Sequence, residues 1–373
     1  MEKLAALLII ILAVCLAFAG CEIFNSTKDG VDDLTSTPVH THSYKAIVTE
    51  TTLGSVSCIT YICDCGDYYT DSAKEYFSTG LKITLNAYQN AYIVRGMGTC
   101  TDKNVYIPPV YEGLPVIAID NRAFYNTDIT SVSIPNSLTY IGREAFASCP
   151  NLTNASISNS VTHLGDAIFS GCTSLKSVII GNSVTSISDS AFYGCSSLTD
   201  ITIPDSVTSI GYEVFRNCSS LTSVTIPDSV TSISDSAFWD CTNLQSVTLG
   251  SGVTEIANGA FFGCTSLTSV TIPDSVTSIG GGAFYGCSSL TSVTIPDSVT
   301  SIGYWAFENC SGLASVTLGN GVTSIGDSAF ENCSSLTTIN YRGTKEQWHA
   351  ILIVASWDYN TGNYTIVYNY TGD

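Results

Sequence analysis

Positive charge is scarce in this 373-residue chain, which has 13 Lys and Arg against 32 Asp and Glu and a formal net charge of −19. Between Arg143 and Arg342 the only Lys or Arg residues are Lys176 and Arg216. Nucleic-acid binding needs clustered Lys or Arg, and electrostatic docking on an anionic membrane needs a basic patch. The composition therefore argues against both kinds of partner.

Residues that carry catalysis are equally sparse. The chain has four histidines: His40, His42, His163 and His349. Neither His163 nor His349 accompanies a Ser or Cys nucleophile with a carboxylate partner. The sequence contains no phosphate-binding loop and no H-E-x-x-H motif. We predict that the protein is not an enzyme and uses no cofactor.

A repeat dominates the chain instead. Cysteine recurs every 23 residues at nine positions: Cys149, Cys172, Cys195, Cys218, Cys241, Cys264, Cys287, Cys310 and Cys333. A fixed period of this size is typical of solenoids, in which a unit too short to bury its own apolar face stacks on its neighbours. We predict a β-rich solenoid of 23-residue coils with a long parallel sheet and a cap at each end.

The segment Leu221–Cys241 shows how one repeat fits a coil. Val224 and Ile226 alternate with polar residues, which predicts a strand with one apolar face. Pro227 lacks an amide donor and ends that strand. The residues predicted to return inward and close the coil are Val230, Ile233, Ala237, Phe238 and Cys241.

Stacked coils place equivalent residues about 4.8 Å apart, so repeated core residues form ladders. One ladder is made of the nine cysteines, because a thiol is usually buried and packs as a small apolar group. We interpret these thiols as reduced and structural, with disulfides or metal binding as alternatives. The residue before each cysteine is mostly Gly or Asn, which predicts a positive φ there. A second ladder consists of Phe146, Phe169, Phe192, Phe215, Phe238, Phe261, Phe284, Phe307 and Phe330.

The N-terminal residues differ from the repeats. An apolar run from Leu4 to Ala19 follows a charged start and is shorter than a membrane-spanning helix, so residues 1–20 are predicted to be a signal peptide. Phe18-Ala19-Gly20-Cys21 resembles a bacterial lipobox, which implies lipidation of Cys21 at a new N-terminus. A plain secretory signal is the alternative. Residues 21–43 have few large apolar side chains and are predicted to be a flexible tether.

The rest of the chain divides by pattern. The predicted segments are a small His/Cys-containing module at 44–79, an N-terminal solenoid cap at 80–120, the solenoid at 121–341 and a C-terminal cap at 342–373. In the N-terminal cap, two short apolar runs around Asn86–Asn90 predict a hairpin. In the C-terminal cap, Thr344 and Gln347 form a capping box, which predicts a short helix that carries Trp348.

The repeated unit resembles the BspA-type leucine-rich repeat of bacterial surface proteins. The residues that carry the resemblance are the Leu-Thr-Ser-Val-Thr-Ile-Pro strand, the Ala-Phe pair and the Cys of each coil, together with Gly113–Val116 and Tyr341–Trp348. The resemblance runs from about Leu81 to the C-terminus. It implies a leucine-rich repeat fold and binding at the cell surface, since some members are adhesins for host matrix proteins or other bacteria. It implies no ligand residues, because its strong motifs are core motifs.

The segment Tyr61–Asp71 resembles small His/Cys modules that accompany such repeats. Those modules imply zinc binding, here by His40, His42, Cys58, Cys63 and Cys65. The sequence departs from their pattern, because C-x-x-C is shortened to Cys63-Asp64-Cys65. We therefore favour a disulfide, which an oxidising exterior permits, or an inert module over a metal site.

Variable positions are the candidates for ligand binding, because the repeated positions build the scaffold. The position after the core phenylalanine varies most, and it and the residues just before the Ala-Phe pair carry several aromatic side chains. We predict that these form an exposed stripe, a feature that often marks an interface. The alternative is that they stack merely to cover the core. The stripe comprises Tyr193, Trp239, Phe262, Tyr285, Tyr304 and Trp305.

Two other rows repeat on the predicted surface. The outward strand position is mostly Thr, which a regular ice or polysaccharide lattice could match, although β-branched residues favour strands anyway. Asp205, Asp228, Asp274 and Asp297 follow the strand proline. Single-file carboxylates offer fewer oxygens than the six to eight of a calcium site, which favours a turn role.

Together these features predict a lipid-anchored extracellular binding protein, an adhesin-like protein–protein interaction scaffold without catalysis. We expect it on the outer face of a bacterial membrane, held by its N-terminal lipid alone, with a protein or glycan as partner. A secreted form is the alternative location, and a structural spacer without a specific ligand is the alternative function.

Overall fold

The computed structural model describes residues 44–52, 55–63, 68–69, 77–354 and 356–372. The predicted signal peptide, Cys21, the tether, His40, His42 and Cys65 lie outside the described residues, so the predictions that concern them stay predictions. The described residues form two compact units. The first comprises the strands before residue 77 with residues 111–113, and the second comprises the remainder.

The first unit contains a small antiparallel sheet. Its strands are β1 (Tyr44–Thr52), β2 (Ser55–Cys63) and β3 (Tyr68–Tyr69), in the order β1-β2-β3. Cys58 and Cys63 both belong to β2. The zinc, disulfide and inert alternatives for this module remain predictions.

The second unit begins with the predicted hairpin. Strands β4 (Lys82–Leu85) and β5 (Tyr92–Gly96) pair antiparallel on either side of the Asn86–Asn90 turn. Strand β5 then pairs in parallel with β8 (Leu114–Ile119), and this connects the hairpin to the first coils. The short strand β7 (Val110–Tyr111) precedes β8.

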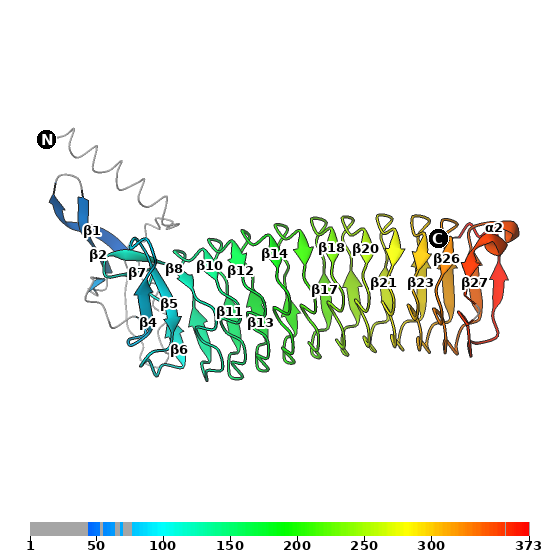
Figure 1. Cartoon of the computed structure of the whole chain (residues 1–373), viewed down its shortest axis with the longest axis horizontal. Helices are drawn as coiled ribbons and strands as arrows, with labels where there is room; N and C mark the ends of the chain where they lie inside the picture. The colour runs from blue at the N-terminus through cyan, green and yellow to red at the C-terminus, as the bar shows by residue number, and fades with distance from the viewer. Residues whose placement is uncertain (1–43, 53–54, 64–67, 70–76, 355, 373) are drawn as a thin grey trace, which may run out of the picture. The chain divides into compact units, whose positions relative to one another are not determined.

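From there the chain winds into a solenoid, coloured cyan to red in Figure 1, whose coils each contribute one strand to a first parallel sheet. Consecutive strands pair at an offset of 23 residues, for example Val224 with Val247 and Val247 with Val270. This confirms the predicted coil length. The strands of the first sheet are β6 (Asn104–Tyr106), β9 (Ser131–Ser133), β11 (Asn154–Ser156), β13 (Ser177–Ile179), β15 (Asp200–Ile201), β17 (Ser223–Thr225), β19 (Ser246–Thr248), β21 (Ser269–Thr271), β23 (Ser292–Ile295), β25 (Ser315–Leu318), β27 (Thr338–Tyr341) and β29 (Thr365–Val367).

A second row of parallel strands, which the sequence did not predict, runs along the solenoid beside the first and is called the second sheet here, although its ladder is interrupted between residues 163–164 and 186–187. Besides β8, its strands have only two residues each, and such short segments give no alternation for a pattern to reveal. Their isoleucine or leucine is buried, as at Ile233, except in the last strand, where Leu352 is exposed and Ile353 is half-buried. The strands are β10 (Tyr140–Ile141), β12 (His163–Leu164), β14 (Ser186–Ile187), β16 (Ser209–Ile210), β18 (Ser232–Ile233), β20 (Glu255–Ile256), β22 (Ser278–Ile279), β24 (Ser301–Ile302), β26 (Ser324–Ile325) and β28 (Leu352–Ile353).

The core phenylalanines stack from coil to coil. Phe238, for example, is 0% exposed and lies between Phe215 and Phe261, with ring centroids 5.1 and 5.3 Å away and nearly parallel planes. The stack begins one coil earlier than the cysteine ladder, at Phe124. At the other end, the ring of Trp357 meets Phe330 edge-on at 5.9 Å.

The cysteine ladder runs beside the phenylalanines, and all nine thiols are buried and free. Each Sγ donates to a phenylalanine carbonyl of the preceding coil, as Cys241 does to Phe215 at 3.1 Å. A thiol at this position therefore fills space and also satisfies a buried carbonyl. Burial raises the pKa of Cys195 and Cys333 to about 12, because it disfavours the thiolate.

We expect the ladder thiols from Cys195 to Cys333 to resist alkylation in the folded protein. Only a thiolate reacts readily, and these thiols are both buried and protonated at pH 8. The measurement is mass-spectrometric mapping of iodoacetamide adducts before and after unfolding in guanidinium chloride. Adducts on Cys241 in the native sample would show that the ladder is accessible to solvent.

Two rows of residues in each coil have positive φ. The first is the residue before each cysteine, from Ser148 to Asn332, where all nine positions have the predicted left-handed conformation. The second row was not predicted, because its residues are of many types, and most of these types do not indicate a positive φ. It comprises Arg122, Glu144, Ala167, Ser190, Glu213, Ser236, Gly259, Gly282, Trp305 and Ser328.

The helix near the C-terminus forms where the capping box places it. In α2 (Lys345–Ala350), the Gln347 amide donates to Thr344 Oγ1 at 3.2 Å and the Thr344 amide donates to Gln347 Oε1 at 2.8 Å. Trp348 is buried and lies edge-on to Tyr341, with ring centroids 5.3 Å apart.

Candidate binding surface

A row of aromatic side chains runs along one side of the solenoid. Trp239, Phe262 and Tyr285 each follow the core phenylalanine of consecutive coils, and we call these three residues the aromatic row. Backbone hydrogen bonds hold their coils in register, from the Asp240 amide to the Phe262 carbonyl at 2.7 Å and from the Gly263 amide to the Tyr285 carbonyl at 2.8 Å. The three side chains are half-buried.

The rings of the aromatic row stack face to face. The centroids of Trp239 and Phe262 are 3.8 Å apart with planes at 10°, and those of Phe262 and Tyr285 are 4.3 Å apart with planes at 3°. The facing sides of adjacent rings are thus covered within the row, while ring edges are left for solvent or a partner. Stacking of this kind adds about 0.5–1.5 kcal/mol per pair beyond the area that it buries.

An arginine closes the N-terminal end of the row. The guanidinium carbon of Arg216 lies 4.9 Å from the Trp239 ring centroid, and the guanidinium also pairs with the Glu213 carboxylate. Arg216 therefore separates the row from Tyr193, which occupies the equivalent position one coil earlier. The structure brings together three of the six predicted stripe residues as a continuous stack and leaves Tyr193 outside it.

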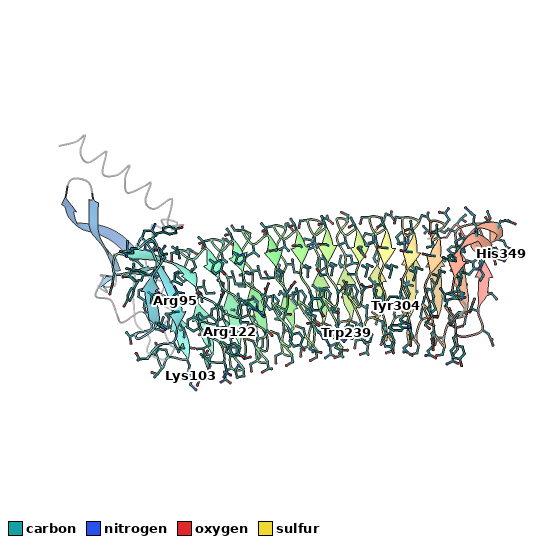
Figure 2. The ribbon with its side chains drawn as sticks, in the orientation of Figure 1. Arg95, Lys103, Arg122, Trp239, Tyr304 and His349 are labelled. Carbon is teal, nitrogen blue, oxygen red and sulfur yellow. The ribbon has the colours of Figure 1, made fainter. Side chains whose placement is uncertain are left out.

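The remaining two stripe residues, Tyr304 and Trp305, are the most exposed, at 51% and 47%. Their rings meet edge-on with centroids 5.0 Å apart. The Tyr304 ring packs on Gly281, where an added Cβ would lie 2.5 Å from its Cζ. Figure 2 shows Tyr304 and Trp239 along the same side of the solenoid.

Trp305 has an unusual backbone for a bulky residue. Its φ is 58°, whereas the equivalent residues of the two preceding coils are Gly259 and Gly282. A left-handed conformation costs a residue with a side chain about 1–2 kcal/mol, but the equivalent residue of every coil from Arg122 to Ser328 has a similar φ, so this conformation is a feature of the coil. Because the side chain is exposed, core packing does not account for a tryptophan here.

Carboxylates continue the row beyond Tyr285. Glu308 and Glu331 occupy the next two equivalent positions, and the Gly286 amide donates to the Glu308 carbonyl at 2.8 Å. The pKa of Glu308 is raised, first by burial and then by the negative charges of Glu331 and Asp327. Within the described residues none of these three carboxylates makes an ion pair.

Other rows of polar side chains form hydrogen bonds between consecutive coils. Just before the strands of the second sheet, threonine hydroxyls donate to the carbonyl of the preceding coil, as Thr231 Oγ1 does to Thr208 at 3.4 Å. Asp228 accepts from the amide and the hydroxyl of Ser251 at 2.7 and 3.0 Å. Asp228 thus stabilises the next coil through these hydrogen bonds, whereas the sequence predicted that it would bond to the backbone of its own turn. The threonines of the first sheet, such as Thr225 and Thr248, are exposed and in register.

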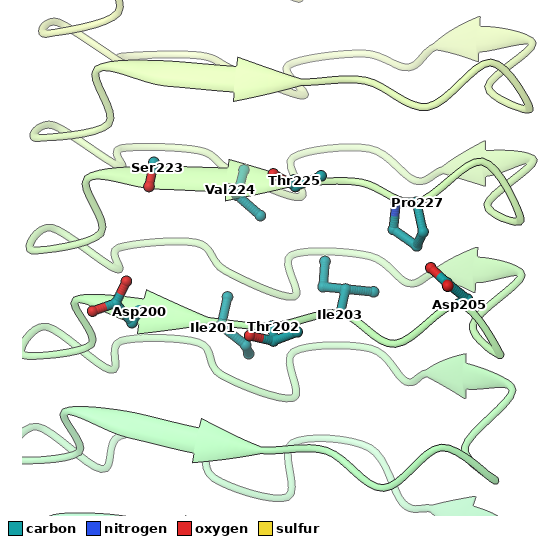
Figure 3. A pocket seen from close by; sticks show the side chains of 9 residues that line it. All are labelled: Asp200, Ile201, Thr202, Ile203, Asp205, Ser223, Val224, Thr225 and Pro227. Atoms are coloured by element: carbon teal, nitrogen blue, oxygen red, sulfur yellow. The ribbon is translucent and has the colours of Figure 1, made fainter.

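A shallow depression opens on the first sheet between β15 and β17 (Figure 3). Among the described strands of this sheet, only this adjacent pair lacks a ladder pairing. The depression is lined mainly by Ile201, Val224, Pro227 and the carboxylates of Asp200 and Asp205. Nowhere in the described part of the chain do three or more His, Cys, Asp or Glu side chains form a group that could hold a metal ion.

The two histidines of the described residues have different surroundings. His163 stacks on Tyr140 in the second sheet, with ring centroids 4.7 Å apart. His349 is exposed near the end of α2.

In the residues that the structure describes, no helix has the length and apolar character needed to cross a bilayer.

Comparison with known families agrees with this architecture. The model of the BspA-type leucine-rich repeat region matches residues 117–245 and 231–350, with six copies. The chain belongs to the BspA-type leucine-rich repeat family. In this BspA-type protein the matched residues are those of the coils. The match therefore identifies the scaffold and assigns no function to the aromatic row. No curated protein matches the sequence.

Several solved structures resemble this BspA-type protein. A leucine-rich repeat protein of T. pallidum is 31% identical, with 59% of this chain and 90% of that chain covered and a TM-score of 0.45. A leucine-rich cell surface protein of Faecalibacterium prausnitzii is 28% identical, with coverage of 74% and 97% and a TM-score of 0.42. The pneumococcal vaccine antigen PcpA is 18% identical, with coverage of 78% and 98% and a TM-score of 0.46.

Proposed function

We propose that this protein is a non-catalytic binding scaffold on the outer face of a bacterial membrane, anchored by a lipid on Cys21, and that it captures a protein partner through its aromatic surface. The observation that carries the proposal is the set of Trp239, Phe262, Tyr285, Tyr304 and Trp305 on one side of the rigid solenoid. Tyr and Trp are enriched among the residues that dominate binding energy at interfaces.

Rigidity supports this proposal. Each coil is held to the next by backbone ladders, thiol–carbonyl bonds and stacked rings, so the surface side chains are held in place before a partner arrives. Preorganisation of this kind lowers the entropic cost of binding. The family and the description of the F. prausnitzii protein as a cell surface protein support the location.

The test is capture of partners by the immobilised full chain and by the double variant Trp239→Ser/Phe262→Ser. We expect the wild-type protein to retain a defined protein that the variant loses or binds at least tenfold more weakly, because two central aromatic contacts are removed. Circular dichroism spectra of both proteins establish that the coils remain folded.

The matched control is Thr225→Ala/Thr248→Ala, which changes two exposed residues of the first sheet. It should capture the same protein as the wild type. Loss of capture in this control alone would place the binding surface on the threonine row, where a glycan lattice is the better partner. Equal capture by all three proteins would contradict the aromatic surface, and absence of any specific partner would favour a structural spacer.

A further inference from the structure

At the N-terminal end of the aromatic row, an arginine of the chain itself covers the last ring. There the Arg216 guanidinium lies over the Trp239 ring and pairs with the Glu213 carboxylate. An aromatic face and a carboxylate are the two groups that together hold a planar cation best, the first by cation–π attraction and the second by charge-assisted hydrogen bonds. The protein fills this position with an arginine of its own.

The opposite end of the row has the same two groups. The Tyr285 ring is parallel to that of Phe262, so one of its faces is covered and the other is turned toward the next coil. That coil places Glu308 at the equivalent position, and Glu331 follows one coil later. No ring of the described residues continues the stack, so the face of Tyr285 that is turned toward the next coil is not covered by another ring.

No positive charge of the described structure balances this end of the row. Glu308, Glu331 and Asp327 make no ion pair in the described residues, and Glu308 is half-buried. The sequence has no Lys, Arg or His between Arg216 and Tyr341. The acidic residues of the same stretch are Asp228, Asp235, Asp240, Glu255, Asp274, Asp297, Glu308, Asp327 and Glu331. Charge complementarity thus favours a cationic partner.

Exposed aromatic side chains flank the same place. Trp305 belongs to the turn that carries Glu308, since the Glu308 amide donates to the Trp305 carbonyl at 3.1 Å. Tyr304 packs on Gly281, one coil back toward Tyr285. Both rings are about half exposed and can cover the aliphatic stem of a long cationic side chain.

We propose that Tyr285, Glu308 and Glu331 bind the guanidinium group of an arginine in a basic segment of the partner protein, while Tyr304 and Trp305 contact its aliphatic stem. Arginine fits better than lysine, because its planar group stacks on a ring and bonds carboxylates in two places at once. This site specifies the class of partner for the binding function proposed above, and the inference rests on that proposed function. The partner expected for this site is a basic protein, in place of an acidic protein or a neutral glycan.

The test uses a hexa-arginine peptide as the probe and the full chain, with affinity measured by isothermal titration calorimetry at 150 mM salt. We expect Glu308→Gln/Glu331→Gln to weaken binding at least about tenfold, because two carboxylates that face the cation are neutralised. Tyr285→Leu, which keeps an apolar side chain but removes the ring, should weaken it about threefold to tenfold.

The matched control is Asp205→Asn/Asp274→Asn, which removes the same charge from exposed positions outside the row. It should bind hexa-arginine within about twofold of the wild type, and hexa-lysine should bind the wild type more weakly than hexa-arginine. Equal weakening in the control and in the glutamate variant would show that only net charge attracts the peptide, and would overturn the site.

The two proposals fail separately. If Trp239→Ser/Phe262→Ser loses the natural partner while Glu308→Gln/Glu331→Gln keeps it, the binding surface stands and the arginine site is wrong. If the glutamate variant loses hexa-arginine but no row variant affects natural capture, the site exists and the proposed function is wrong.

Discussion

Replacing Phe238 by alanine is expected to lower the free energy of unfolding by about 3–5 kcal/mol. The side chain is 0% exposed and stacks between Phe215 and Phe261, so its removal leaves a cavity that rings on both sides cannot fill without breaking the ladder. The measurement is urea denaturation followed by circular dichroism.

Thr248→Ala is the control for this variant. Thr248 lies on β19 and is exposed, so its loss should change the unfolding free energy by no more than about 0.5 kcal/mol. An equal loss from the two variants would mean that the phenylalanine ladder is not what holds the coils together.

Deleting one whole coil is expected to leave a folded protein, whereas deleting half a coil is not. Removal of residues 150–172 joins Cys149 to Thr173 and brings Leu175 to the position of Leu152, so every ladder stays in register. A solenoid whose units contact only their neighbours should keep its circular dichroism spectrum and lose about the stability of one unit.

Removal of residues 150–161 shortens the chain by less but shifts every later residue out of register with the coil before it. Buried phenylalanine and cysteine positions then meet polar ones at the junction, so we expect cooperative unfolding to be lost. The comparison of urea denaturation curves for the two deletions measures this. A half-coil deletion at least as stable as the whole-coil deletion would rule out the 23-residue coil as the structural unit.

Repetition made the scaffold predictable from sequence. A single Phe or Cys says little, but nine copies at one spacing fix the period, the inward positions and the positive φ before Cys241 and its equivalents. The Thr344–Gln347 pair predicted α2 because a capping box acts through neighbouring residues alone.

Features that depend on contacts between coils could not be predicted in this way. The second sheet has strands too short to show alternation, and the bond from Cys241 Sγ to the Phe215 carbonyl appears only when the coils are stacked. The positive φ of Trp305 could not be predicted from its residue type, because a tryptophan does not indicate a left-handed conformation.

The same distinction applies to the candidate site. Variation among the repeats of this chain indicated the position after the core phenylalanine as a candidate, and Trp239, Phe262 and Tyr285 stack at that position. The variation did not indicate that Arg216 covers one end of the row, because this depends on ring orientation.

Neighbouring residues of one coil have separate roles in this account: Phe238 holds the fold, and Trp239 belongs to the surface that binds a partner. The most direct test measures the unfolding free energy and partner capture together for Phe238→Ala and for Trp239→Ser/Phe262→Ser. We expect the first variant to lose stability while its folded fraction still captures the partner, and the second to keep a cooperative unfolding transition and lose capture. A second variant that unfolds as readily as the first, or that captures the partner as well as the wild type, would contradict it.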